Sequence, residues 1–256
     1  GQVRVAQNGV IQAEAAIGSD VRTFRSVLEE FAAEDPRFVV EVIEEEPMRK
    51  KTRREGMFDL TGKVAIVTGG NGGIGLGIGR GLARAGARVV VAARNEEKSR
   101  EALNELRALG SDALALSVDV ADERSVAAMM EEAAARCGGI DILVNNAGMS
   151  IRNPVHLLAP DHWRKVLDTN LTGAFLCCRS VYPYLKQRGA GKVINICSML
   201  SIFGASYAPA YSASKGGLVQ LTKSMAIAWA EDRIQVNAIL PGWIDTDLTR
   251  AARNHV

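Results

Sequence analysis

The stretch that decides the fold is Lys63–Gly79, KVAIVTGGNGGIGLGIG, in which an apolar run passes into a loop crowded with glycine. A continuous apolar run is typical of a parallel strand that is buried on both faces. After the loop, Ile74, Ile78 and Leu82 recur at helical spacing, and Gly86 follows as a stop signal. Such a loop lets backbone N–H groups and the helix N-terminus face a pyrophosphate, although glycine there can also serve close packing of the helix on the strand.

The glycines of this loop allow two registers. Gly70, Gly72 and Gly75 fit the pattern G-x-G-x-x-G. Gly69, Gly73 and Gly75 fit the pattern T-G-x-x-x-G-x-G equally well. The loop by itself does not choose between them.

The same alternation of strand and helix continues along the chain. Further strands are predicted at 88–93, 113–118, 140–145, 192–197 and 234–239. Further helices are predicted at 95–109, 122–137, 161–188 and 211–231. This order predicts an α/β fold: a three-layer αβα, doubly wound parallel sheet with right-handed crossovers over residues 57–256.

Residues 1–56 differ from the rest. Ser19 or Asp20 can cap a helix that ends at Pro36, and Phe38–Ile43 reads as a short strand. A basic stretch at 47–57 then reads as a solvated tether, with a nucleic-acid patch as the weaker alternative. We therefore expect an N-terminal α/β extension of unknown role that ends in a basic linker.

Composition excludes several classes of protein. The 256 residues carry a net charge of +2 with both signs intermixed, so no overall field favours nucleic acid. No apolar run reaches the roughly 18 residues of a membrane span, and no signal-peptide pattern is present. The four cysteines show no paired C-x-x-C spacing, and Cys177 and Cys178 lie in an apolar run that predicts burial. We expect a cytoplasmic protein with neither a nucleic-acid nor a membrane partner, and, because the three histidines lack ligand spacing, no metal.

The end of the second strand, VVVAARN, carries information about a dinucleotide. An acid at this place would bind the ribose 2′-hydroxyl of NAD, but here Arg94 stands instead. A guanidinium can pair with a 2′-phosphate, so NADP is favoured and NAD stays possible. The alternative is a solvent-facing arginine at a strand end.

Three further strings narrow the class of protein: NNAG at Asn145–Gly148, YSASK at Tyr211–Lys215 and PGWIDT at Pro241–Thr246. Together with the loop they resemble the short-chain dehydrogenase/reductase family, in its short single-domain branch, over about residues 57–250. The resemblance implies a Rossmann fold and an NAD(P)-dependent oxidoreductase that transfers a hydride between the cofactor and a secondary alcohol or ketone. A homodimer or homotetramer built on helices 161–188 and 211–231 is implied as well.

The resemblance also selects the register of the loop. It assigns Gly69, Gly73 and Gly75 to the cofactor. Gly77 and Gly79 then fall inside the helix, where we expect them to cost stability and to permit close approach to the sheet or cofactor.

The catalytic positions that the resemblance implies are Asn170, Ser198, Tyr211 and Lys215. Tyr211 and Lys215 are four residues apart and so share one helix face. A nearby ammonium favours the phenolate, which lets Tyr211 exchange a proton with the substrate oxygen. Ser198, 211 − 198 = 13 residues earlier, would hydrogen-bond that oxygen, and Asn170 would hold a water that links Lys215 to solvent.

The cofactor positions, by resemblance and from the Arg94 argument, lie at strand ends and in loops. They are Thr68, Gly69, Asn71, Gly73, Ile74, Gly75, Arg94, Asp119, Val120, Asn146, Gly148, Tyr211, Lys215, Pro241, Gly242, Ile244 and Thr246. The substrate positions follow these loops and are expected to be Arg152, Leu200, Phe203 and Trp243, with Met149, Ser150, Ile151 and His156 beside them. Arg152 can attract an anionic group. Sugar, polyol, steroid and oxoacyl substrates stay open.

The sequence departs from the family at two places. Gly72 stands where many NADP-preferring relatives carry a basic residue, which weakens the case from Arg94. The chain also ends at Val256, where relatives continue into a substrate lid and a seventh strand. We therefore expect a domain that is incomplete at its C-terminus, and an NADP(H)-binding scaffold or truncated homologue without turnover is the alternative function.

Overall fold

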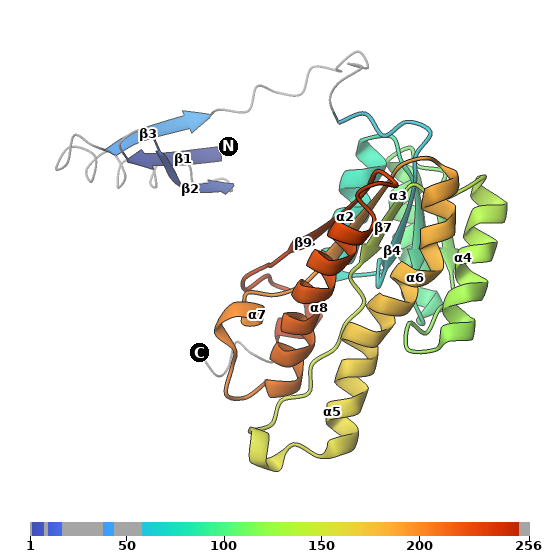
Figure 1. Ribbon diagram of the computed structural model, residues 1–256. Helices are drawn as coiled ribbons and strands as arrows, with labels where there is room; N and C mark the ends of the chain where they lie inside the picture. Colours follow the sequence, from blue (N-terminus) through green and yellow to red (C-terminus); the bar gives the residue numbers. More distant parts are fainter. Residues whose placement is uncertain (1, 8–9, 17–37, 44–57, 251–256) are drawn as a thin grey trace. The chain divides into compact units, whose positions relative to one another are not determined.

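The computed structural model describes residues 2–7, 10–16, 38–43 and 58–250, and the chain divides into two compact units, Gly1–Gly56 and Met57–Val256 (Figure 1). Each unit is described by itself.

The smaller unit holds a three-stranded antiparallel sheet. Its strands are β1 (Gln2–Gln7), β2 (Val10–Ala16) and β3 (Phe38–Ile43), in the order β2-β1-β3. The strand predicted at 38–43 is confirmed. The helix predicted between Ser19 and Pro36 and the basic linker lie outside the described residues. The hairpin of β1 and β2 was not predicted, although Asn8-Gly9 in the sequence between them is a known signal for a two-residue turn.

The larger unit is built on one parallel sheet of six strands. They are β4 (Val64–Thr68), β5 (Arg88–Ala92), β6 (Leu114–Leu116), β7 (Ile142–Asn145), β8 (Gly191–Ile196) and β9 (Ile234–Ile239), in the order β6-β5-β4-β7-β8-β9. This confirms the predicted doubly wound parallel sheet, with β6 shorter than expected. The strand order reverses between β4 and β7, and ligands of such sheets bind beyond the carboxyl ends of the strands at that point.

Helices cover both faces of this sheet (Figure 1). They are α2 (Gly73–Arg84), α3 (Glu96–Ala108), α4 (Glu123–Cys137), α5 (Pro160–Leu167), α6 (Gly173–Gln187), α7 (Leu200–Phe203), α8 (Pro209–Ala228) and α9 (Asp247–Arg250). On one face Ala83 of α2 and Leu106 of α3 pack against the strands, and on the other Met130, Val181 and Met225 of α4, α6 and α8 do so. Among the described residues no helix is both long and apolar enough to cross a membrane.

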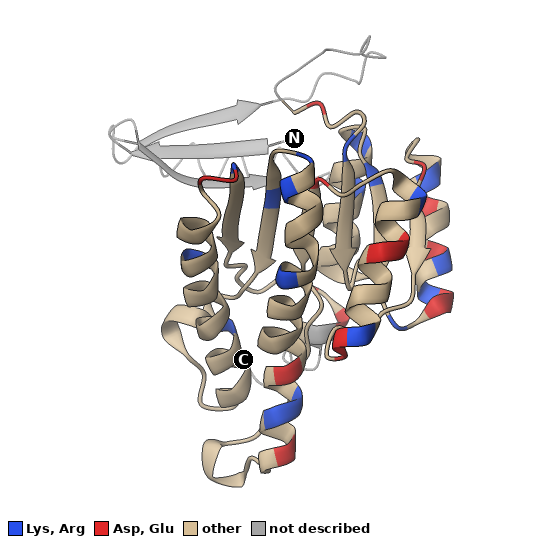
Figure 2. Ribbon diagram, turned by 45° about the vertical axis from the view of Figure 1, so that its right-hand side comes forward, with Lys and Arg blue, Asp and Glu red and all other residues tan. Residues whose placement is uncertain are grey.

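Charge is distributed in both signs over the outward helices of the larger unit, as Figure 2 shows. The interior is apolar: Cys177 and Cys178 are 0% exposed, as predicted, and burial raises the pKa of Cys178 to about 12. These thiols therefore pack as small apolar side chains.

The helix predicted at 161–188 is interrupted. Between α5 and α6 the segment Asp168–Thr172 forms a π-helical turn. Asn170 lies in it, and Gly173 follows, where a Cβ would come within 2.9 Å of the Val120 carbonyl oxygen. Such turns are rare and frequently mark functional sites. The short helices α7 and α9 and the 3₁₀ turn Val155–Leu157 were not predicted either.

A buried chain of polar side chains crosses the sheet on the α8 side. Asn145 of β7 donates from Nδ2 to Asn195 Oδ1 of β8 at 2.9 Å, and Asn195 Nδ2 donates to Thr222 Oγ1 of α8 at 2.9 Å. The two asparagines are also register partners in the ladder that joins β7 to β8.

Candidate active site

The glycine loop between β4 and α2 leaves no room for side chains at three positions. Gly69 has φ +62°, and a Cβ there would lie 3.1 Å from both Ala147 Cα and Asn146 Nδ2. Gly73 has φ +49°, and a Cβ on Gly75 would overlap Asn146 Nδ2 and the Gly69 carbonyl oxygen.

The other register is only partly crowded. A Cβ on Gly70 would meet the Val67 carbonyl oxygen at 2.8 Å, whereas a Cβ on Gly72 would have open space around it. The open space at Gly72 therefore favours the register of Gly69, Gly73 and Gly75 for this glycine cradle. Its backbone can approach a pyrophosphate closely, so the residues present fit a dinucleotide.

Thr68 and Asn146 hold the loop against the end of β7. Thr68 Oγ1 accepts hydrogen bonds from the backbone N–H groups of Asn146 at 3.0 Å and Ala147 at 3.1 Å. Asn146 Nδ2 donates in return to the carbonyl oxygens of Thr68 at 3.0 Å and Gly69 at 3.1 Å. These contacts hold the glycine loop to the ends of both β4 and β7.

Four cavities with shared walls run from the end of β5 to α7. The Arg94 cavity is lined by Gly69, Asn71, Ala92, Ala93, Arg94, Asn95, Lys98, Val118, Asp119, Val120, Ala147, Gly148 and Thr169. The glycine-loop cavity is lined by Gly69, Asn71, Gly72, Gly73, Ile74, Lys98, Asn146, Ala147, Gly148, Thr246 and Asp247. The Tyr211 cavity is lined by Ile74, Asn146, Gly148, Ile196, Cys197, Ser198, Tyr211, Lys215, Pro241, Gly242, Ile244, Thr246 and Thr249. The Arg152 cavity is lined by Ser150, Arg152, Ser198, Met199, Leu200, Tyr207, Ala208, Tyr211, Gly242, Trp243 and Thr249.

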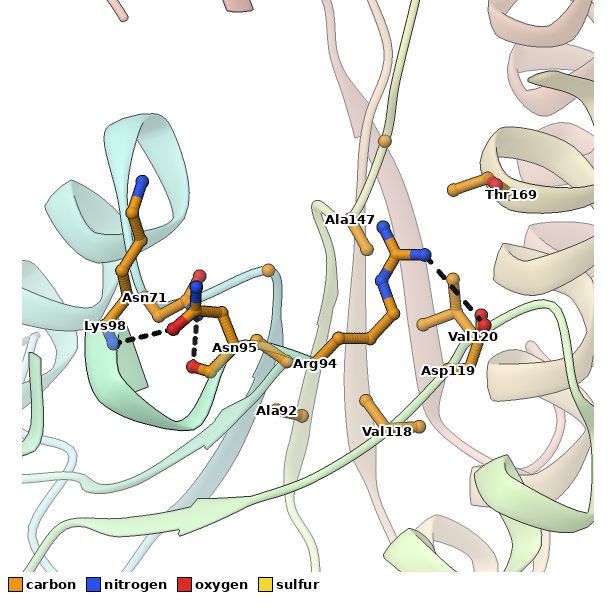
Figure 3. Close-up of a pocket in the computed structure, with 13 residues that line it drawn as sticks. Asn71, Ala92, Arg94, Asn95, Lys98, Val118, Asp119, Val120, Ala147 and Thr169 are labelled. Carbon is orange, nitrogen blue, oxygen red and sulfur yellow. Dashed lines mark hydrogen bonds and ion pairs between the residues drawn. The ribbon is translucent and has the colours of Figure 1, made fainter. Parts of the chain in front are cut away.

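The cavities gather most of the predicted cofactor positions. Of these, Thr68 and Gly75 line none of the four cavities, because both are buried beneath the loop. Figure 3 shows Arg94 reaching across the Arg94 cavity toward Asp119, whose carboxylate lies 4.0 Å from the guanidinium. Asn71 donates from Nδ2 to the Asn95 carbonyl oxygen at 3.2 Å and to Ser99 Oγ at 3.1 Å, which ties the glycine loop to the start of α3.

Ser198 and Tyr211 line both the Tyr211 cavity and the Arg152 cavity, and Lys215 lines the Tyr211 cavity. Lys215 Nζ lies 5.8 Å from the ring centroid of Tyr211. The ammonium is buried and donates to the Ile196 carbonyl oxygen at 2.7 Å, and burial lowers the pKa of Lys215 to about 8.

The pKa of Tyr211 is raised above its ordinary value. Burial is the main cause, and the hydrogen bond with Ser198 offsets only part of it. In this structure Tyr211 is therefore a phenol, the form that can donate a proton. The expected effect of the ammonium on a phenolate stays a prediction.

The side chain of Asn170 bonds to the loop after β7 and to α8, and its expected water-holding role stays a prediction. Its Oδ1 accepts from Met149 N at 2.8 Å, and its Nδ2 donates to the Met149 carbonyl oxygen at 2.9 Å and to Ser214 Oγ at 3.0 Å. Ser214 Oγ donates in turn to the Tyr211 carbonyl oxygen at 2.7 Å. Asn170 thus fixes the loop after β7 relative to α8. Ser214, which sequence reasoning did not single out, stands directly before Lys215 in YSASK.

The Arg152 cavity contains three of the four predicted substrate positions. Phe203 is the exception: it lines none of the four cavities and is 78% exposed, because it lies at the outer end of α7. Met149, Ile151 and His156 do not line the Arg152 cavity, whereas Ser150 does.

Tyr207 is a lining residue that the sequence did not reveal. Its ring lies 5.5 Å from the Arg152 guanidinium carbon, and its carbonyl oxygen accepts from Asn153 N at 3.0 Å. The only sequence signal for it is that it stands four residues before Tyr211, just outside α8.

The parallel sheet, the glycine cradle and the Tyr211–Lys215 pair define a dinucleotide-binding oxidoreductase. Residues 63–256 match the family model described as short chain dehydrogenase. Over 198 residues the chain is 40% identical to the 2-dehydro-3-deoxy-D-gluconate 5-dehydrogenase of Formosa agariphila, covering 77% of this chain and 75% of that protein. Over 187 residues it is 41% identical to the cis-4-hydroxycyclohexanecarboxylate dehydrogenase of Sinomonas cyclohexanicum, covering 73% and 75%. A solved variant of actinorhodin polyketide ketoreductase with NADPH is 40% identical and superposes with a TM-score of 0.73 over 75% of each chain.

The chain belongs to the short-chain dehydrogenase/reductase family. It is an NAD(P)-dependent oxidoreductase that acts on CH–OH groups. The expectation that the domain is incomplete at its C-terminus stays a prediction.

Proposed function

We propose that the chain interconverts a secondary alcohol and a ketone, with Tyr211 as the residue that gives or takes the proton. The observation that carries this proposal is the shared wall: Ser198 and Tyr211 line both the Tyr211 cavity and the Arg152 cavity. A carbonyl or hydroxyl group in the Arg152 cavity can therefore reach both hydroxyls while the nicotinamide occupies the other side.

The chemistry divides between cofactor and protein. When bound, the nicotinamide supplies or accepts the hydride at the carbon atom. In the reducing direction the Tyr211 hydroxyl gives its proton to the substrate oxygen, and in the oxidising direction it takes that proton back. Ser198 Oγ hydrogen-bonds the same oxygen as charge develops on it. Lys215, with a pKa of about 8, is mostly an ammonium at neutral pH and stabilises negative charge on Tyr211.

The cofactor proposed is NADP(H). Arg94 lines the cavity at the end of β5, where an NAD-binding acid would stand, and Ala93 precedes it. The related polyketide ketoreductase was solved with NADPH, which supports the assignment. The other cofactor positions assigned from the sequence are proposed together with it.

The substrate class proposed is a hydroxy acid or its keto acid. Arg152 faces the Arg152 cavity and stacks on Tyr207, which holds the guanidinium at a wall shared with Ser198 and Tyr211. Both curated relatives named above act on a carboxylate that carries a hydroxyl or keto group. A guanidinium binds a carboxylate through two parallel hydrogen bonds.

Turnover tests the function directly. Wild-type protein is offered hydroxy acids, sugar acids and oxoacyl thioesters with NADP⁺ or NADPH, and absorbance of the reduced cofactor is followed. Tyr211→Phe is expected to lower kcat by about 10²- to 10⁴-fold, the contribution of a positioned acid or base. Binding of NADPH, followed by its fluorescence, is expected to stay within twofold. Unchanged turnover in Tyr211→Phe would contradict the role of Tyr211.

Arg152→Met tests the substrate class. We expect kcat/KM for a hydroxy acid to fall about tenfold or more, because a charge-assisted pair is lost, with no matching fall for its methyl ester. Equal losses for the acid and the ester would overturn the carboxylate assignment but leave the reaction type intact.

We also propose a homodimer or homotetramer formed through α6 and α8. Phe175 of α6 is 41% exposed and Ile227 of α8 is 81% exposed, so each helix presents an apolar side chain to its surroundings. A monomeric mass in solution at micromolar concentration would contradict this proposal.

A further inference from the structure

Lys98 is a cation of the cofactor region that neither the sequence nor the catalytic chemistry assigns. It lies in the first turn of α3, where its N–H donates to the side chain of the N-cap residue Asn95 at 2.9 Å. Its side chain lines both the Arg94 cavity and the glycine-loop cavity. Figure 3 shows Lys98 and Arg94 on opposite sides of Asn95. Lys98 therefore stands where the two cavities share lining residues, and Arg94 lines the Arg94 cavity.

Each of these cations faces a carboxylate. Arg94 lies 4.0 Å from Asp119, and Lys98 Nζ lies 3.3 Å from Asp247 Oδ2. Asp247 is the first residue of α9 and stands 149 positions away from Lys98. The pair is open to solvent, with side chains 56% and 69% exposed. An exposed pair of this kind is held weakly.

The pyrophosphate of the dinucleotide does not need Lys98, because the start of α2 offers it other partners. The N-cap position of α2 is Gly72, which offers no side chain, so the backbone N–H groups at this helix start are free of side-chain capping. They suit two singly charged phosphate groups. A 2′-phosphate is different, because it is a monoester that carries close to two negative charges at neutral pH. Its charge calls for a second cation beside Arg94, and Lys98 is the other Lys or Arg in the lining of the Arg94 cavity.

We propose that Lys98 is a second ligand of the 2′-phosphate of NADP(H), and that Asp247 competes with that phosphate for the ammonium. The inference rests on the proposed preference for NADP(H). The doubly charged phosphate displaces the carboxylate from Lys98, whereas NAD(H), which lacks the phosphate, leaves the Lys98–Asp247 pair in place. Lys98 and Asp247 together thus set how strongly the protein distinguishes the two cofactors.

The test measures the dissociation constants of NADPH and NADH by fluorescence titration of the full chain, without substrate. Lys98→Met is expected to raise the NADPH constant about tenfold and to leave the NADH constant within twofold. Asp247→Asn is expected to lower the NADPH constant about two- to fivefold and to change the NADH constant less. In the Lys98→Met background, Asp247→Asn is expected to lose its selective effect on NADPH.

Matched variants separate this effect from a general change of surface charge. Arg164 and Asp161 form an exposed ion pair at 2.7 Å that lines none of the four cavities. Arg164→Met and Asp161→Asn are expected to leave both constants unchanged. Thermal melting of each variant shows that the protein is folded, and Lys98, at the surface, tolerates the change.

The outcomes are distinguishable. If Lys98→Met weakens NADPH and NADH by the same factor, Lys98 serves the pyrophosphate and the inference is overturned. If Asp247→Asn acts equally with and without Lys98, the competition is overturned. If Arg94→Met is selective for NADPH while Lys98→Met is neutral, the proposed cofactor stands and only the role of Lys98 fails. If no variant is selective and NADH binds as tightly as NADPH, the NADP(H) preference itself has failed.

Discussion

The buried ammonium of Lys215 affects both the stability of the folded protein and the chemistry proposed for Tyr211. The ammonium is enclosed by protein and donates a hydrogen bond to the Ile196 carbonyl oxygen, and burial lowers its pKa from 10.5 to about 8. No carboxylate lines the Tyr211 cavity within the described part of the chain. Burying this charge therefore lowers the free energy of unfolding. The same ammonium can stabilise a phenolate at Tyr211.

The pH dependence of stability follows from this pKa. Between about pH 8 and 10.5 the unfolded chain holds a proton on Lys215 that the folded chain has released, so this residue's contribution to the free energy of unfolding rises with pH. Below about pH 8 the burial cost is present in full. Urea unfolding of wild type and Lys215→Met at pH 7.5 to 9.5 checks this prediction.

The expected result is that the difference in the free energy of unfolding between wild type and Lys215→Met shifts in favour of wild type as pH rises. Lys223→Met, which removes an exposed lysine from the same helix, is the control. Its difference from wild type in the free energy of unfolding is subtracted at each pH. A difference that stays flat for Lys215→Met across this range would show that the ammonium is less buried than described.

Residues whose roles are visible in short sequence strings were predictable. Residues whose roles depend on contacts between distant parts of the chain were not. Ser198, Tyr211 and Lys215 were predicted from the resemblance to the family, because the strings that carry them are short and local in the sequence. Lys98 and Asp247 meet only through the tertiary fold, so neither carries a local signal. The exposure of Phe203 was not predictable, because an apolar residue near a site looks the same in sequence whether its side chain faces inward or outward.

At the scale of the element, the start of α2 separates two kinds of glycine. Gly75 is buried and a Cβ there would overlap the loop, whereas Gly77 is exposed and a Cβ there would meet nothing within 4 Å. Gly77 therefore makes no close approach to the sheet, and its expected approach to the cofactor stays a prediction. A Cβ on Gly79 would lie 3.5 Å from Leu106 Cδ2, which is an ordinary van der Waals contact, so packing does not require glycine there.

Alanine substitutions test this difference. Gly77→Ala is expected to stabilise the protein by about 0.5–1 kcal/mol, because alanine loses less backbone entropy in a helix. Gly75→Ala is expected to destabilise it by about 1–3 kcal/mol, because the loop must move to admit the methyl group. NADPH affinity is expected to fall in Gly75→Ala alone. Equal behaviour of the two variants in thermal melting and NADPH titration would contradict the cradle.

The elements of the sheet were predictable because β4, β5, β6 and β7 are nearly continuous apolar runs, and β8 and β9 are rich in Val and Ile. The π-helical turn was not, since the chain around Asn170 has ordinary helical periodicity. Its irregularity comes from Asn170 binding the Met149 backbone and from the close approach of Gly173 to Val120. Both contacts join segments that are separated in sequence.

At the scale of the whole unit, Asp141 joins three segments of the chain at the amino ends of the strands, the end of the sheet opposite the cavities. Its carboxylate accepts from Val64 N at 2.9 Å, Lys63 Nζ at 3.3 Å and Arg188 Nη2 at 3.0 Å. Burial raises its pKa, but the hydrogen bonds from Val64, Arg188 and Lys63 outweigh burial, and the pKa lies below its ordinary value.

Asp141→Asn is expected to lower the free energy of unfolding by about 2 kcal/mol or more at pH 7, because hydrogen bonds to a charged group are lost. The stabilisation is present above the ordinary carboxyl pKa of 3.8 and is lost as pH falls through the lowered value. The wild-type advantage should therefore shrink on acidification. Asp112→Asn, at an exposed pair with Arg88, is the control and should cost less than about 1 kcal/mol. Similar losses in both variants would contradict the role of Asp141.

The paired amides of Asn145 and Asn195 have a consequence for assembly of the sheet. Strands made of Val and Ile could slide past one another by one residue with little loss of apolar contact, but such a slip would turn Asn195 to the opposite face. Buried amides would then lose their partners, at a cost of about 1–3 kcal/mol for each unsatisfied group. The asparagine pair thus selects a single alignment of β7 with β8. Asn146 follows β7 by one residue, and Ser198 follows β8 by two. The same alignment therefore sets the separation between Asn146, which holds the glycine loop, and the proposed catalytic serine.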